Sequence, residues 1–189
     1  MRERLRAQER DAPWIAGMTS LALSRALDVP EGALGRVLAS AVEDGGLVYR
    51  RGYYATAEFV PELTAEQREF FDRWLAGDPA QPLRPVPFAA VASQMRAARV
   101  AGLAQAFETL LADGVLVKVD DQLYRDAQIA EIRSLLEAAL RRDGAIGPAA
   151  FRDLLETTRK YALPLLEWFD AAGVTLRSGD LRVLRGKKP

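Results

Sequence analysis

Basic side chains gather at two places near the end of the chain, where together they could bind phosphate. Arg159 and Lys160 open a predicted helix, and Arg177 and Arg182 lie on the predicted hairpin that follows it. A helix start offers free backbone N–H groups and the positive end of the helix dipole, so anions bind there favourably. Thr158, or the threonine before it, is expected to cap this helix and to offer a hydroxyl to phosphate. The pattern predicts a two-pronged clamp for a polyanion.

The composition excludes much of enzyme chemistry. The 189 residues contain neither cysteine nor histidine, which removes a Cys nucleophile, a Ser–His pair and an ordinary zinc site. Neither of the sequences GxxxxGK[ST] and GxGxxG occurs, so a nucleotide-binding fold is not predicted. No signal peptide is visible, and no apolar run approaches the roughly 20 residues that cross a bilayer. We therefore expect a cytoplasmic protein without catalysis, metal, cofactor or membrane partner.

The net charge of zero hides an asymmetry along the chain. Residues 58–126 hold 7 Arg or Lys against 11 Asp or Glu, whereas residues 127–189 hold 11 against 8. The middle of the chain is therefore acidic and its end is basic. A polyanionic partner is expected to bind the C-terminal part.

Three segments repeat one order of elements: helix, helix, turn, helix and hairpin. The hairpin turns are predicted at Arg50–Gly52, Asp120–Asp121 and Ser178–Asp180, and the helix before each hairpin ends at a glycine suited to a left-handed cap. This order is typical of a winged helix. The sequence thus predicts a mainly α protein with small β wings, a tandem array of three winged helices. The predicted domains span residues 1–60, 61–126 and 127–189.

The second segment contains two further local signals. Thr64, with Gln67 three residues later, predicts a capping box at a helix start. Residues 77–87 contain four prolines and are expected to form a stiff surface loop. The acids at Asp120–Asp121 would repel phosphate, so this segment is interpreted as a spacer, and Arg50 and its neighbours give the first segment only a modest basic patch.

Ordered motifs in the third segment carry a family resemblance. They are Phe151–Leu155, Thr158–Ala162, Pro164–Asp170, Gly173–Thr175 and Arg177–Leu184. With these motifs the segment resembles the last winged-helix domain of the bacterial selenocysteine-specific translation elongation factor. The two earlier segments resemble the preceding winged helices of that factor, with weaker motifs.

The resemblance implies a function in translation elongation. In that family a C-terminal array of four winged helices follows a GTPase half that carries selenocysteinyl-tRNA, and the last winged helix binds a hairpin in selenoprotein mRNA beside the UGA codon. This chain has no GTPase motif and room for only three units, so it resembles a C-terminal fragment. GTP and tRNA binding are not assigned to it. The implied partner is the mRNA hairpin, the ribosome stays open as a second partner, and we expect a monomer.

The motif positions also imply the RNA-binding residues. Gly179 is expected to allow the tight turn of the wing. Asp180 is interpreted as a turn cap, or as an acceptor for a base or an arginine, and Tyr161 as core beside the wing, or as a platform for an unpaired base. The full set is Thr158, Arg159, Lys160, Tyr161, Arg177, Gly179, Asp180 and Arg182.

Two other functions remain open from the sequence. A winged-helix transcriptional regulator would bind duplex DNA, usually as a two-fold dimer. A protein-interaction scaffold would use the acidic second segment and would show no salt-dependent binding of nucleic acid.

Overall fold

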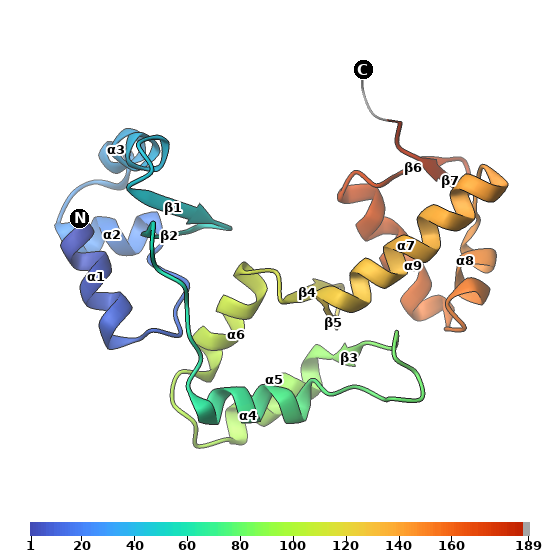
Figure 1. Ribbon diagram of the computed structural model, residues 1–189, viewed down its shortest axis with the longest axis horizontal. Coiled ribbons are helices and arrows are strands. Elements are labelled where there is room, and N and C mark those ends of the chain that lie inside the picture. Colours follow the sequence, from blue (N-terminus) through green and yellow to red (C-terminus); the bar gives the residue numbers. More distant parts are fainter. Residues whose placement is uncertain (187–189) are drawn as a thin grey trace. The chain divides into compact units, whose positions relative to one another are not determined.

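The computed structural model describes residues 1–186, and its elements are mostly helices with three small sheets (Figure 1). Lys187 and Lys188, which are among the basic residues counted in the C-terminal part of the sequence, lie outside these residues. Within residues 1–186, every helix is too short or too polar to span a membrane. Two compact units make up the chain: unit 1 contains residues 1–76 and 92–116, and unit 2 contains the remainder.

Unit 1 begins with three helices and a hairpin. They are α1 (Arg2–Asp11), α2 (Ser20–Leu27), α3 (Glu31–Glu43), β1 (Leu47–Arg50) and β2 (Tyr53–Thr56). A small apolar core of Leu5, Leu23, Leu34, Leu38 and Leu47 joins the three helices to the hairpin. Leucines placed three or four positions apart lie on one face of a helix, which explains how α3 presents two of them to this core.

Further helices complete unit 1: α4 (Ala65–Trp74), most of α5 (Phe88–Ala97) and α6 (Leu103–Ala112). The hydroxyl of Thr109 donates to the Trp14 carbonyl at 2.7 Å and accepts from the Ala16 N–H at 2.9 Å. Gly102 packs against the indole of Trp14 so closely that a Cβ would stand 2.3 Å from its nitrogen. These contacts join α6 to the segment between α1 and α2.

Unit 2 contains a three-stranded sheet and the C-terminal helices. The strands are β3 (Val86–Pro87), β4 (Leu116–Val119) and β5 (Gln122–Arg125), in the order β3-β5-β4. Part of the predicted proline-rich loop is therefore a strand, since Val86 pairs with Leu123. The side-chain amide of Gln128 donates to the carbonyls of Pro82 and Arg84, at 2.6 and 3.2 Å, and these bonds hold the remaining loop in place.

The C-terminal elements follow the predicted order of helix, helix, helix and hairpin. They are α7 (Asp126–Asp143), α8 (Pro148–Leu154), α9 (Arg159–Ala171), β6 (Thr175–Ser178) and β7 (Leu181–Leu184) (Figure 1). Buried side chains such as Ile132, Leu136, Phe151, Leu166 and Phe169 form one core between the three helices. Gly173, in the left-handed region at φ +73°, ends α9 as the sequence predicts.

The division into three domains stays a prediction. All three segments show the expected order of helices and hairpins. The middle segment, however, contributes α4 and α6 to unit 1 and its hairpin β4–β5 to unit 2, with Leu116 at the boundary.

The predicted capping box is confirmed and offers a test of helix stability. The Thr64 hydroxyl accepts from the Gln67 N–H at 3.2 Å, and the Gln67 side chain accepts from the Thr64 N–H at 3.0 Å. We expect Thr64→Ala to lower the free energy of unfolding by about 1 kcal/mol. Urea titration followed by the fluorescence of Trp74, on the same helix, measures this change.

Thr158→Ala is the matched control for this prediction. Thr158 occupies the same N-cap position of α9, but within residues 1–186 its side chain makes no capping bond. We expect a change of less than about 0.5 kcal/mol, with Trp168 as the reporter. Equal costs for the two variants would contradict the assignment of a stabilising box to Thr64.

Candidate nucleic-acid interface

The start of α9 combines a free helix end with two exposed cations. Thr158 is the N-cap, and Thr158, Arg159 and Lys160 are all exposed. Across the helices of residues 1–186, α9 is the one whose first turn carries basic but no acidic residues. Cations at the positive end of a helix dipole are unfavourable, by about 0.3–1 kcal/mol each at exposed positions. Two cations at this position become favourable once an anion binds at the helix end and contacts both of them.

The wing turns sharply at Gly179. This residue has φ +62°, a conformation in which a side chain is strained, so the sequence prediction for Gly179 is confirmed. The Nε of Arg177 donates to the Gly179 carbonyl at 3.0 Å, which holds the exposed guanidinium beside the turn. Asp180 follows at the tip and is also exposed.

Arg182 is buried, although the sequence predicted it as part of an exposed basic surface on the wing. Its side chain is 3% exposed, and its Nε pairs with Oδ2 of Asp170 at 3.1 Å. The Thr175 hydroxyl donates to the other carboxylate oxygen of Asp170 at 2.6 Å. The backbone of Arg182 also exchanges two hydrogen bonds with Ile146, of 2.8 and 3.0 Å. Arg182 therefore connects the wing to α9 and to the segment before α8.

These elements enclose a groove between α8, α9 and the wing. Arg159, Leu163 and Glu167 line it from α9 at intervals of four residues, which places them on one helix face. The cavity has a volume of about 520 Å³. We call it the wing groove. It is lined by Pro148, Ala149, Arg152, Arg159, Leu163, Glu167, Arg177, Asp180 and Arg182.

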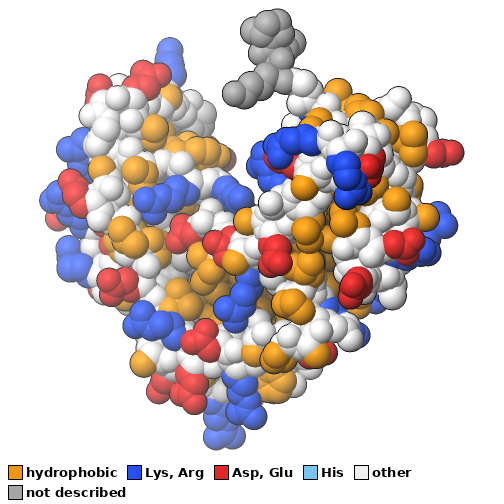
Figure 2. All heavy atoms as spheres, turned by 45° about the vertical axis from the view of Figure 1, so that its right-hand side comes forward, with side chains coloured by type: hydrophobic (Ala, Val, Ile, Leu, Met, Phe, Trp, Pro, Cys, Tyr) orange, Lys and Arg blue, Asp and Glu red, His pale blue; other side chains and the backbone are white. Residues whose placement is uncertain are grey.

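The groove carries both signs of charge. Arg152, Arg159 and Arg177 bring exposed or half-exposed guanidinium groups, while Glu167 and Asp180 bring carboxylates. Figure 2 shows Lys and Arg side chains close to Asp and Glu side chains on the visible face of the molecule. Cations in such a groove suit phosphate, and carboxylates accept the N–H groups of base edges.

Tyr161 lies on the other side of α9. It is half-buried and lines a different cavity, with Tyr124 of β5 and residues 80–84. The expectation that Tyr161 packs beside the wing is wrong, because a residue two positions after Arg159 points about 200° away around the helix. Lys160 remains near it, with Nζ 5.6 Å from the centre of the ring.

Two residues of the interface escaped the sequence prediction. Arg152 lines the wing groove from α8, and Asp170 is the partner of the buried Arg182. Arg152 could have been found from its place on α8, the helix that precedes the turn of the helix-turn-helix. The spacing of Asp170 and Arg182 along the chain, in contrast, gives no signal of their contact.

The architecture of the C-terminal part defines its class. A three-helix core with a hairpin wing and a third helix that starts with two cations is a winged helix whose exposed surface suits nucleic acid. Residues 138–184 match a family model described as "Elongation factor SelB, winged helix".

Two curated relatives agree with this match. The chain is 41% identical over 88 residues to a selenocysteine-specific elongation factor of Desulfomicrobium baculatum, which is 44% of this chain and 13% of the relative. It is 37% identical over 67 residues to the factor of Escherichia coli K12, which is 35% of this chain and 11% of the relative. The alignments thus span about an eighth of the length of these relatives. The resemblance seen in the sequence is confirmed.

Two solved structures are similar as well. The mRNA-binding domain of elongation factor SelB from E. coli, in complex with SECIS RNA, is 25% identical with a TM-score of 0.50, and the match covers 66% of this chain and all of that one. The bacterial selenocysteine-specific elongation factor EF-Sec has a TM-score of 0.53 at 13% identity, over 97% of this chain and 28% of that one. The second likeness concerns the fold alone.

The burial of Arg182 predicts a large cost of removing it. Arg182→Ala leaves Asp170 without its cation, and we expect the free energy of unfolding to fall by about 3 kcal/mol. Arg177 is the exposed cross-strand neighbour of Arg182. We expect Arg177→Ala to change the free energy of unfolding by less than about 0.5 kcal/mol. Urea unfolding followed by Trp168 fluorescence measures both. If the two variants were equally stable, the ion pair would have no structural role.

Proposed function

We propose that this chain is the RNA-binding C-terminal part of a selenocysteine-specific translation elongation factor. Its last winged helix binds the hairpin of selenoprotein mRNA during UGA recoding. The start of α9 and the tip of the wing hold phosphates, and the wing groove takes bases of the hairpin loop. The confirmed similarity of residues 138–184 to the SelB winged helix supports this proposal.

One observation carries the proposal: the pair Arg159 and Lys160 at the positive end of α9. The other helices with a charged first turn, α1, α3, α4 and α7, each place an acid there. An acid at this end stabilises a helix and a cation destabilises it. An anionic ligand explains why α9 carries cations where these helices carry an acid. The exposed Arg177 adds a further cation on the wing side of the groove.

Within this proposal Thr158, Arg159, Lys160 and Arg177 contact the RNA backbone, and Asp180 accepts a hydrogen bond from a base. Gly179 allows the tight turn of the wing, and Arg182 connects the wing to α9 through its ion pair with Asp170. Tyr161 lines a cavity other than the wing groove.

The rest of the chain precedes this domain. We propose that it is a tandem of three winged helices, monomeric and cytoplasmic, with no catalytic role of its own. Contact of the first winged helix with the ribosome is compatible with the exposed Arg51 in its hairpin turn, although Nη1 of this residue also donates to the Leu111 carbonyl at 2.6 Å.

The proposal predicts the salt dependence of RNA binding. Arg159→Ala with Lys160→Ala is expected to weaken binding of a SECIS RNA hairpin by on the order of 2 kcal/mol. It also lowers the slope of log K against log salt by about two units. Because the substitutions remove two cations from a positive helix end, the thermal stability of the variant is expected to stay equal or to rise.

Arg68→Ala with Arg96→Ala is the control, since it removes the same charge from exposed positions of α4 and α5. It is expected to leave both the affinity and the slope nearly unchanged. Competition with duplex DNA completes the test. Equal loss in the two double variants, or stronger binding of duplex DNA, contradicts the proposal.

A further inference from the structure

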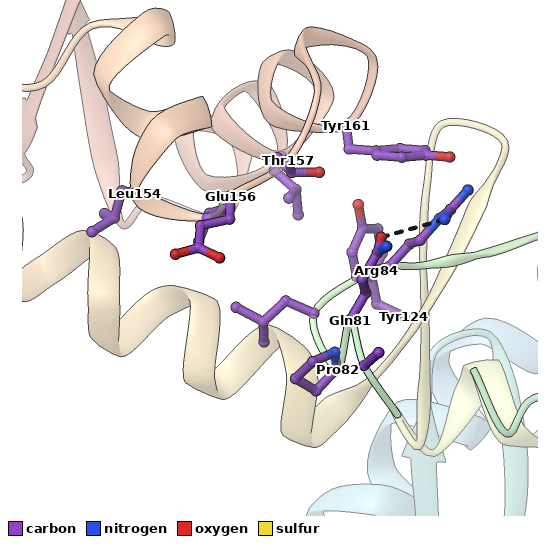
Figure 3. A pocket seen from close by; sticks show the side chains of 12 residues that line it. Gln81, Pro82, Arg84, Tyr124, Leu154, Glu156, Thr157 and Tyr161 are labelled. Atoms are coloured by element: carbon purple, nitrogen blue, oxygen red, sulfur yellow. Dashed lines mark hydrogen bonds between the residues drawn. The ribbon is translucent and has the colours of Figure 1, made fainter. Parts of the chain in front are cut away.

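A second cavity lies on the opposite side of α9 from the wing groove. Its volume is about 200 Å³, and it opens between the loop of residues 80–84, the end of α8 and the start of α9. All of these residues belong to unit 2. We call it the tyrosine pocket. Figure 3 shows Tyr161 and Arg84 on one side of it and Glu156 on the other.

The inner wall of the tyrosine pocket is apolar. Leu155, Leu165 and Tyr124 are all buried there. Burial raises the pKa of the Tyr124 phenol well above its usual value, and the neighbouring Tyr161 adds to the rise. The hydroxyl of Tyr124 is uncharged at neutral pH, as in an ordinary tyrosine. An apolar wall of this kind favours binding of a flat, uncharged group and disfavours binding of an ion.

The rim of the pocket is polar and charged. Arg84 is exposed, with Nη1 3.3 Å from Oε1 of Gln81, and the exposed carboxylate of Glu156 faces it across the opening. A carboxylate at the mouth repels phosphate. The guanidinium of Arg84 and the ammonium of Lys160, which lies over the ring of Tyr161, are available to phosphate outside. The pocket thus combines a ring and a guanidinium plane with an apolar floor, the surroundings that an unpaired base prefers.

The size of the pocket limits its occupant. Sites for drug-sized molecules measure about 300–1,000 Å³, and this cavity is smaller. One planar ring system fits better than a complete nucleotide or an oligonucleotide segment. Sugar and phosphate would remain at the rim with the cations.

The pocket is also within reach of the proposed RNA surface. Arg159 and Tyr161 are two residues apart on α9 and point to opposite sides of its first turn. Thr158 and Lys160, both exposed, lie at the helix end between them. A strand that crosses the start of α9 could therefore contact the wing groove on one side and the tyrosine pocket on the other.

We propose that the tyrosine pocket is a second RNA subsite, which binds one unpaired nucleobase by stacking it against Tyr161 and Arg84. This inference rests on the proposed function, and it deepens it. The base comes from the same hairpin that the wing groove holds. The loop before β3 thereby contributes Arg84 to recognition, which otherwise depends on the C-terminal domain alone.

The experiment pairs protein variants with RNA variants. A SECIS RNA hairpin and a series in which each unpaired nucleotide is abasic are titrated against the wild-type chain, Tyr161→Ala, Tyr161→Phe and Arg84→Ala. Tyr161→Ala is expected to lower the affinity for the intact hairpin about tenfold, as the loss of one base–aromatic stack implies. Tyr161→Phe keeps the ring and is expected to bind like the wild type. For one abasic RNA the wild type and Tyr161→Ala are expected to bind equally.

Two controls keep the test decisive. Tyr161→Leu fills the pocket with an apolar side chain but offers no flat ring, so it must also lose about tenfold if stacking is the cause. Thermal unfolding followed by Trp168 shows that each variant is folded.

The possible failures differ from one another. Wild-type affinity of Tyr161→Ala for every RNA overturns the subsite and leaves the proposed function standing. So does a loss that is equal on all abasic RNAs, because the effect would then not depend on a base. Absence of hairpin binding by the wild type overturns the proposed function itself, and the subsite with it.

Discussion

The ion pair between the buried Arg182 and the partly buried Asp170 connects the wing of the C-terminal domain to α9. The guanidinium of Arg182 reaches Asp170 at the end of α9, and the Thr175 hydroxyl occupies the other oxygen of that carboxylate. The backbone N–H and carbonyl of Arg182 both form hydrogen bonds with Ile146, which precedes α8. One residue of the wing thus fixes the hairpin against two other parts of the domain. We infer that these contacts keep the wing at a fixed distance from α8 and α9. The wing groove lies between these three elements, and the exposed arginines line it.

The same pair explains which face of the wing is buried. Thr175 and Arg182 are buried, while Leu176 and Leu181, on the other face of the two strands, are each 46% exposed. In most half-buried hairpins the apolar residues point inward. Here the inward face carries the polar Thr175 and Arg182 beside the partly buried Leu184, and Asp170 supplies a charged partner from α9. The alternation of side chains was visible in the sequence, but the direction of each face depended on a contact distant along the chain.

Local signals therefore predicted the elements and not the environment of each side chain. The capping box at Thr64, the left-handed Gly173 and the turn at Gly179 follow from the backbone preferences of single residues. Each of them was predicted correctly. The burial of Arg182 and the position of Tyr161 away from the wing depend on tertiary packing, and no local spacing reports on them. The exposed cations at the start of α9 were found because a free helix end is itself a local feature.

The mixed charge of the wing groove is consistent with recognition of bases as well as phosphates. A surface made of cations alone binds any polyanion, and its affinity falls steeply with salt. Glu167 and Asp180 reduce the attraction for phosphate inside the groove, so the backbone of a ligand is favoured at the rim, near Arg159 and Arg177. The carboxylates then face base edges, where N–H groups can donate to them. Under the proposed function the cationic rim would supply most of the affinity, and the acids, where they exclude phosphate, would supply the selectivity.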